Sequence, residues 1–205
     1  MTDRAINVFI NCPIDADYKP CFEALVFTVL ASGYRVRCAL EDSNSGDIRF
    51  EKLCRLIEAC DKSIHDLSRV ELNPSGLPRF NMPFEFGLFL GAHRFGGKRH
   101  KTKTALAMVA APYKLPVYLS DVAGNDPVAH RNDPMEVIRI VRGFLHVRPD
   151  GSQLPGAAYF RNSFAWFKAE LPSLAAALNI AEDEIDPFRD YKDYIALLQP
   201  TLLAF

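Results

Sequence analysis

Residues 5–12, "AINVFINC", decide the fold class that the sequence predicts. The run is apolar and rich in β-branched and aromatic side chains. A strand without polar alternation is typical of a parallel sheet that is buried on both faces. The next apolar pattern, residues 21–33, has helical spacing, and Gly33 ends it. A buried strand followed by a helix is the first unit of an α/β sheet.

The same alternation continues along the next hundred residues. The expected strands cover residues 34–41, 62–68 and 104–110, and the expected helices cover 48–60 and 82–96. A short edge strand is expected within residues 113–126, where Pro116 limits its length. Strands that alternate with helices form parallel sheets. We therefore expect an α/β fold with a parallel sheet of four to five strands and helices on both faces.

Beyond about residue 127 the pattern becomes helical. Expected helices cover residues 134–145, 163–178 and 188–198. The stretch at 148–156 contains proline and glycine and is polar, which marks the expected boundary. The sequence thus predicts an α/β domain over residues 1–147 and a helical C-terminal extension over residues 148–205.

Composition excludes several classes of protein. The chain has 205 residues and a net charge of −1, which gives no electrostatic reason to expect nucleic acid or a membrane surface as a partner. No apolar run is long enough for a membrane helix, and the N-terminus lacks the pattern of a signal peptide. Five cysteines without a C-x-x-C pair favour a reduced, cytoplasmic protein without a disulfide framework.

Several common motifs are missing. The sequence has neither the glycine-rich turn of a dinucleotide-binding fold nor a phosphate-binding P-loop. It lacks the G-x-S-x-G turn of the α/β-hydrolases. The histidines show no metal-ligand spacing, so no metal and no bound cofactor are expected.

Polar residues gather where the expected strands end, and ligands of open parallel sheets bind at those ends. The candidate residues at the three converging segments are Asn11, Cys12 and Pro13, then Asp66, Ser68 and Arg69, then Arg79, Asn81 and Glu85. Phosphates could be held by Arg35, Arg37, Arg69 or Arg79. The three segments should meet at one crevice.

Glu85 lies inside the most apolar helix of the chain. Pro83 fits the first turn of that helix, and Asn81 or Met82 is expected to be the N-cap. The positive helix end, with Arg79 nearby, should favour the ionised carboxylate, which suits a nucleophile better than a general acid. Alternatively, Glu85 caps the first turn of the helix.

Other candidates also have a structural interpretation. Asp66 could anchor a loop, His65 is typical of a core histidine, and Tyr18 could simply pack in its loop. In the loop 120–130, Asp121, Asp126 and His130 either line the same site or form a turn. The sequence leaves these alternatives open.

Four motifs together resemble one family of proteins. They are "VFINCPIDADY", "IHDLSR", "LPRFNMPFEFGLFLGA" and "YLSDVAGNDPVAH", and they span roughly residues 5–145. This set resembles bacterial TIR-like nucleotide-binding proteins, which are similar to nucleoside 2-deoxyribosyltransferases and to effectors of retron-type phage defence. The resemblance implies a flavodoxin/TIR-like fold and a homo-oligomer, a dimer or larger.

The resemblance also assigns roles to three residues. Glu85 corresponds to the nucleophile at the anomeric carbon, Asp66 to the strand-end acid near the leaving base, and Tyr18 to the tyrosine that orients the nucleophile. Residues 69–80 form a longer loop than the transferases have. Because the transferases often complete their site from a neighbouring subunit, the choice between transfer and hydrolysis stays open.

The resulting hypothesis is an enzyme. It would be an N-glycosidase or an N-ribosyl-transfer enzyme for a nucleoside, nucleotide or NAD, acting through a carboxylate nucleophile in antiviral defence. The first alternative is a non-catalytic TIR-like module that senses a nucleotide. The second is an interaction domain in which Glu85 only caps a helix.

Overall fold

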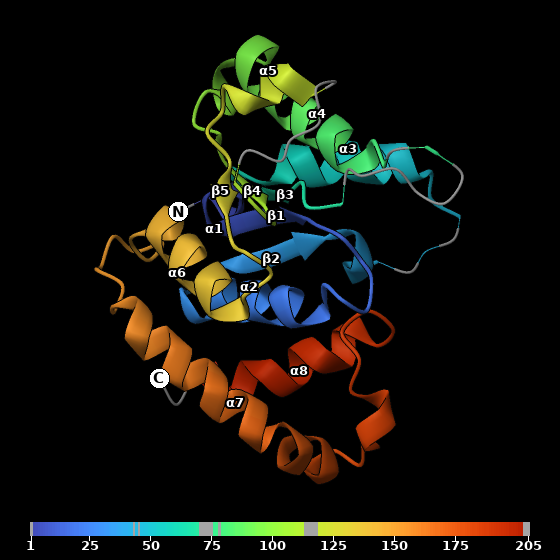
Figure 1. The fold of residues 1–205 in the computed structure, drawn as a ribbon, viewed down its shortest axis with the longest axis vertical. Helices are drawn as coiled ribbons and strands as arrows, with labels where there is room; N and C mark the ends of the chain where they lie inside the picture. Colours follow the sequence, from blue (N-terminus) through green and yellow to red (C-terminus); the bar gives the residue numbers. More distant parts are fainter. Residues whose placement is uncertain are drawn as a thin grey trace. The chain divides into compact units, whose positions relative to one another are not determined.

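The sheet has the strand order β2-β1-β3-β4-β5, and every pair of neighbours is parallel (Figure 1). A computed structural model describes residues 2–42, 44, 46–69, 76, 77, 79–112 and 119–202. In this part of the chain the strands are β1 (Asn7–Asn11), β2 (Arg35–Cys38), β3 (Lys62–Asp66), β4 (Thr104–Val109) and β5 (Val128–Ala129).

Helices connect the strands and form the C-terminal region. They are α1 (Asp3–Ile6), α2 (Lys19–Ala31), α3 (Arg49–Ala59), α4 (Asn81–Phe95), α5 (Ser120–Ala123), α6 (Pro134–Leu145), α7 (Ala157–Ala177) and α8 (Tyr191–Leu202). Single turns of 3₁₀-helix are η1 (Ala39–Glu41), η2 (Lys98–His100) and η4 (Glu182–Glu184). The predicted fold class, a parallel α/β sheet of the flavodoxin-like type followed by a helical extension, is confirmed.

Several elements differ from the sequence prediction. Ala5 and Ile6 belong to α1 and residues 39–41 to η1, although both segments were expected to be strand. The edge strand β5 forms at residues 128 and 129, beyond the segment 113–126 that was expected to hold it. Residues 113–118 lie outside the described residues, and Ser120–Ala123 is helical instead. Helix α7 begins six residues earlier than predicted, because Phe160 extends its buried side by one turn.

The contacts divide the chain into two units. The first unit is Met1–Pro13 with Arg35–Asn132, and the second is Ile14–Tyr34 with Asp133–Phe205. The first unit contains the whole sheet with α3, α4 and α5. The predicted boundary at residue 148 stays a prediction.

In the first unit, α3 and α4 lie beside each other on one face of the sheet (Figure 1). Phe9 of β1 and Phe89 of α4 pack there against the apolar side of α3. Side chains alternate along a strand, so every second residue of β1 and β3 faces these helices. His65 belongs to this set, because its ring contacts Phe86 and Phe89.

The second unit is helical. Helix α2 is buried along most of its length and packs with α6. Phe27 of α2 contacts Phe164 and Phe167 of α7. Lys168 of α7 pairs with the buried Glu23 of α2 at 2.7 Å. The helical C-terminal extension therefore shares its core with α2, an early segment of the chain.

Across the described ranges, every helix is too short or too polar to cross a membrane.

Candidate functional site

The carboxyl ends of β1 and β3 lie side by side in the middle of the sheet. Asn11, the last residue of β1, is opposite His65 of β3. The chain leaves β1 towards β2 on one side, whereas β3 lies on the other side. In open parallel sheets, ligands bind at such a switch point. The sheet thus brings together the two strand ends from which the sequence predicted a crevice.

The amide of Asn11 ties this edge to the start of α4. Its Nδ2 donates to Nδ1 of His65 over 3.0 Å and to the carbonyl of Met82 over 3.1 Å. Met82 is the second residue of α4, so this helix does begin at the same edge. Both hydrogen bonds use Nδ2, and within the described ranges Oδ1 accepts no hydrogen bond from another residue.

His65 is a neutral residue of the core. Its ring is fully buried among Phe9, Phe86 and Phe89. Because Nδ1 accepts from Asn11, the ring proton is on Nε2. Burial lowers the pKa of His65 to about 3. Its role is to hold Asn11, which agrees with the core interpretation of this histidine.

The low pKa of His65 makes stability depend on pH. Unfolded His65 takes up a proton near pH 6.5, whereas folded His65 does so only near pH 3. Stability is therefore expected to fall as the pH drops through this window, by about 1.4 kcal/mol per pH unit from this group. Urea unfolding at several pH values measures this dependence of the free energy of unfolding on pH. His65→Gln should flatten the dependence, and an unchanged slope would contradict the assignment.

Asp66 is completely buried at the end of β3, and both of its oxygens are engaged. The backbone N–H of Ser68 donates to Oδ1 over 2.9 Å, and Oδ2 lies 2.9 Å from Nε2 of His130. The hydroxyl oxygen of Ser68 lies 2.8 Å from the same Nε2. His130 is also fully buried. This cluster joins the end of β3 to the segment after β5.

The backbone decides which nitrogen of His130 carries the proton. The N–H of Asn132 donates to Nδ1 over 3.1 Å, so the proton is on Nε2 and points to Asp66 and Ser68. A nucleophilic triad needs the serine and the carboxylate on opposite nitrogens. Here both lie at Nε2. The cluster therefore has the geometry of an anchor, although it has the composition of a triad.

The structure does not bring Asp66 next to Glu85. Since His65 faces α4, the neighbouring Asp66 points to the opposite face of the sheet. Glu85 lies on α4 and pairs with Arg49 instead. The two carboxylates that the resemblance placed in one mechanism thus have separate surroundings.

Glu85 is largely buried and weakly paired. Its side chain is 14% exposed, and Oε1 lies 4.0 Å from a guanidinium nitrogen of Arg49, which is itself 77% exposed. Burial raises the pKa of Glu85, and the positive charge of Arg49 offsets this only in part. Within the described ranges, this ion pair is the polar contact that Glu85 makes.

The sequence prediction for the electrostatics of Glu85 was wrong. The N-cap of α4 is Phe80, and neither Asn81 nor Met82 takes that position. Glu85 is therefore the fifth helical residue, beyond the free N–H groups of the first turn. Desolvation consequently outweighs the helix end, and Glu85 does not cap the helix.

The other candidates are spread around this edge. Cys12 and Pro13 are buried directly after β1, while Arg79 and Asn81 are exposed at the start of α4. Arg69 is half-buried after Ser68. Tyr18 is buried and precedes α2 in the second unit, so its role beside Glu85 stays a prediction.

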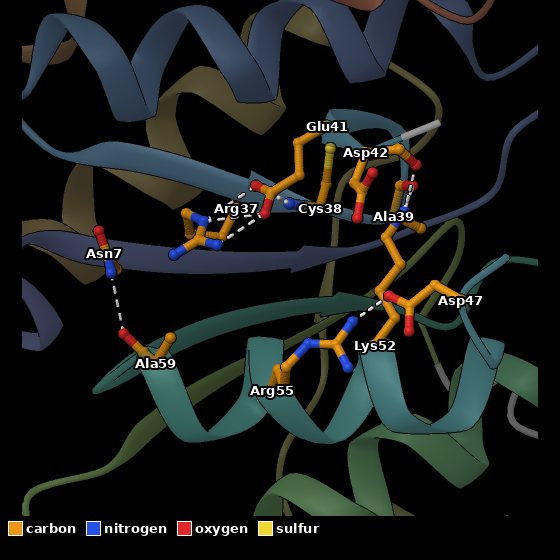
Figure 2. Close-up of polar contacts among 10 residues, drawn as sticks. All are labelled: Asn7, Arg37, Cys38, Ala39, Glu41, Asp42, Asp47, Lys52, Arg55 and Ala59. Atoms are coloured by element: carbon orange, nitrogen blue, oxygen red, sulfur yellow. Dashed lines mark hydrogen bonds and ion pairs between the residues drawn. The ribbon is translucent and has the colours of Figure 1, made fainter. Parts of the chain in front are cut away.

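The arginines of β2 are engaged in local ion pairs. Figure 2 shows Arg37 bound by both carboxylate oxygens of Glu41, which also accepts from the N–H of Cys38. Lys52 of α3 donates to the carbonyls of Ala39 and Asp42, which fastens the loop after β2 to α3. Arg35 pairs with Asp3 at 3.6 Å. Arg37 is thus a structural residue.

Sequence reasoning missed Arg49 entirely. It is the first residue of α3, and nothing in its local pattern connects it to Glu85. His130 was noticed only as one of several loop residues. Two consecutive left-handed residues, Arg131 and Asn132, place the N–H that orients its ring. An asparagine two residues after the histidine was the available signal, because asparagine tolerates this conformation.

The site resembles no metal centre, since the described ranges hold no cluster of three or more metal-binding side chains. The candidate residues that the structure leaves for a ligand are Glu85 with Arg49, and Asn11 at the switch point of the sheet. Comparison of the whole chain with protein-family models, curated proteins and solved structures finds no match.

Proposed function

We propose that this protein cleaves or transfers the N-glycosidic bond of a nucleoside, a nucleotide or NAD, with Glu85 as the carboxylate that meets the anomeric carbon. The supporting observation concerns the surroundings of Glu85. Its carboxylate is largely buried, does not cap the helix, and has a long ion pair with Arg49. Burying a weakly paired carboxylate costs folding free energy, and such residues are commonly found where they bind a ligand or take part in a reaction.

The chemistry fits a carboxylate of this kind. As the bond from ribose C1′ to the base nitrogen breaks, its electron pair goes to the base and C1′ becomes cationic. The Glu85 carboxylate stabilises C1′ or bonds to it, and water or a second acceptor then takes the sugar. The free Oδ1 of Asn11 is an acceptor for a ribose hydroxyl.

The surroundings of Asp66 favour one class of substrate. A neutral base leaves well only when an acid protonates it. Asp66 is fully buried, hydrogen bonded and on the other face of the sheet from α4, so an acid role for it has no support. The nicotinamide of NAD already carries a positive charge and departs as a neutral molecule. We therefore place NAD and related pyridinium nucleotides ahead of ordinary nucleosides.

The same observation supports an alternative. A site with a weakly paired carboxylate, and with Asp66 engaged elsewhere, could bind a nucleotide without turnover. The protein would then be a nucleotide-sensing module. Either role fits a cytoplasmic protein in antiviral defence, and five free cysteines are usual in a reducing compartment.

Incubation with NAD and with a panel of nucleosides and nucleotides tests the proposal. Chromatography would follow the release of nicotinamide or free base. We expect release from NAD, with slower or no release from neutral nucleosides. Binding of NAD by calorimetry without any release would favour the sensing module. A protein that releases neither nicotinamide nor free base, and that does not bind NAD, would contradict both functions.

A further inference from the structure

One face of α4 carries an exposed stripe of large and small residues. The α4 stripe consists of Phe80, Phe84, Gly87, Gly91 and Phe95, which follow one another at spacings of four, three, four and four. Residues at these spacings lie on one side of a helix. Another side of α4 packs on the sheet, through Phe86 and Phe89.

The rings of the stripe are open to solvent. Phe80 and Phe84 are each 53% exposed, and Phe95 is 87% exposed. Single exposed rings are common, but aligned rings mark an interaction surface. Phe84 is steadied by a ring contact with Phe50 of α3, with centroids 6.3 Å apart. The patch is therefore built on two helices that are fixed to the sheet.

The two glycines have no explanation within this unit. Glycine in a helix interior is unfavourable compared with alanine. A Cβ at Gly87 or Gly91 would meet nothing within 4 Å among the described residues. Each lies in the middle of α4, with ordinary helical backbone, so neither a turn nor a positive φ requires it. Close approach by another backbone would explain both.

The order of sizes along the stripe suits a second copy of the same helix. The small residues lie at its centre and the rings lie at its ends. In an antiparallel pair related by a two-fold axis near residue 89, the Phe84 ring of one chain lies beside Phe95 of the other. The glycines face each other and allow the close contact. The stripe is thus complementary to itself.

The exposed rings supply about two thirds of the smallest area that a specific dimer needs, and rim residues add to it. With roughly 200 Å² for a whole phenylalanine side chain, the three rings of the stripe expose roughly 400 Å² per chain. Two chains would bury about 800 Å² from the rings alone, and the neighbouring Phe50 and Ile48 are exposed at the rim. A specific interface buries about 1,200–2,000 Å² in total, so we expect a dissociation constant in the micromolar range.

We propose that this protein forms a symmetric dimer through the α4 stripe, with the two α4 helices antiparallel. Dimer formation does not depend on the proposed reaction, although Glu85 lies on the same helix. The obvious variant is Gly91→Leu, which adds a good helix former where the chain itself has space. It should preserve the fold and prevent the close approach of the helices.

Sedimentation velocity between about 1 and 100 µM tests the dimer, because this range brackets micromolar affinity. With rising concentration, the apparent mass of wild type should approach twice the 23.0 kDa of one chain. The apparent mass of Gly91→Leu should stay at that of one chain. Gly143→Leu is the matched control, since Gly143 is an exposed helical glycine of α6 whose added Cβ also meets nothing. It should dimerise like wild type.

A second variant tests the same interface in case Gly91→Leu does not fold. Phe95→Glu changes a side chain that is 87% exposed, and it should also give a monomer with an unchanged circular dichroism spectrum. Leu178→Glu, at an exposed position after α7, is its control and should leave the dimer intact. A monomeric wild type at the highest concentration, or a folded Gly91→Leu protein that still dimerises, would overturn the proposal.

Discussion

Glu85→Gln is expected to lower the rate of nicotinamide release from NAD by about 10³-fold or more, because the amide neither bonds to C1′ nor stabilises its positive charge. The variant has nearly the same shape, so nucleotide binding should change little. Single-turnover release measured by chromatography, with NAD affinity from calorimetry, separates the two effects.

Stability distinguishes this role from a structural one. Burial raises the pKa of Glu85, so its charge is unfavourable in the folded protein at neutral pH. The uncharged Glu85→Gln should therefore unfold at the same denaturant concentration as wild type, or at a higher one. Glu51→Gln, an exposed acid in the first turn of α3, serves as the control with full activity. Retained activity, or a marked loss of stability, in Glu85→Gln would contradict the assignment.

Arg49 should tune the pH at which the enzyme becomes active. A nucleophilic Glu85 must be ionised, and its raised pKa places the acid limb of the rate profile above that of an ordinary glutamate. Arg49 lowers this pKa, so Arg49→Gln should move the acid limb to still higher pH. The pH dependence of kcat measures the shift. A limb that moves down would exclude Arg49 as the partner of Glu85.

His130→Leu is expected to destabilise the fold by about 3 kcal/mol, because it removes the Nε2–H donor that lies 2.9 Å from Oδ2 of the buried Asp66 carboxylate. The backbone N–H of Ser68 would still donate to Oδ1 of this carboxylate. Urea unfolding at neutral pH gives the free energy. The loss should appear even in the absence of any nucleotide.

The control for His130 is another histidine. His93 is exposed near the end of α4, and His93→Leu should change the free energy of unfolding by less than about 0.5 kcal/mol. If His130→Leu were equally harmless, the cluster at the end of β3 would contribute nothing to stability. It would then be a candidate for a role in ligand binding.

The elements of the fold were predictable because their patterns are local. The apolar run before Asn11 and the helical spacing before Gly33 follow from burial on two faces of a sheet or one side of a helix. The start of α7 shows the limit of such patterns. Whether Phe160 belongs to the helix depends on its burial in the second unit, which the sequence does not reveal.

The candidate site was predictable in its position but not in its electrostatics. Asn11 and the start of α4 meet at the expected edge, because parallel strands end together. The pKa of Glu85 depends instead on the packing of α3 beside α4, which brings Arg49 near and removes water. The link from Asp66 to His130 joins distant parts of the chain, and no local pattern contains it.

The two outer strands of the sheet are unsuited to pairing with strands of other molecules. β5 has two residues, and β2 has four, of which Arg35 and Arg37 are charged. Short or charged edge strands are poor templates for the addition of a foreign strand. Growth of the sheet into fibrils from its edges is therefore disfavoured in the folded protein, even at high concentration.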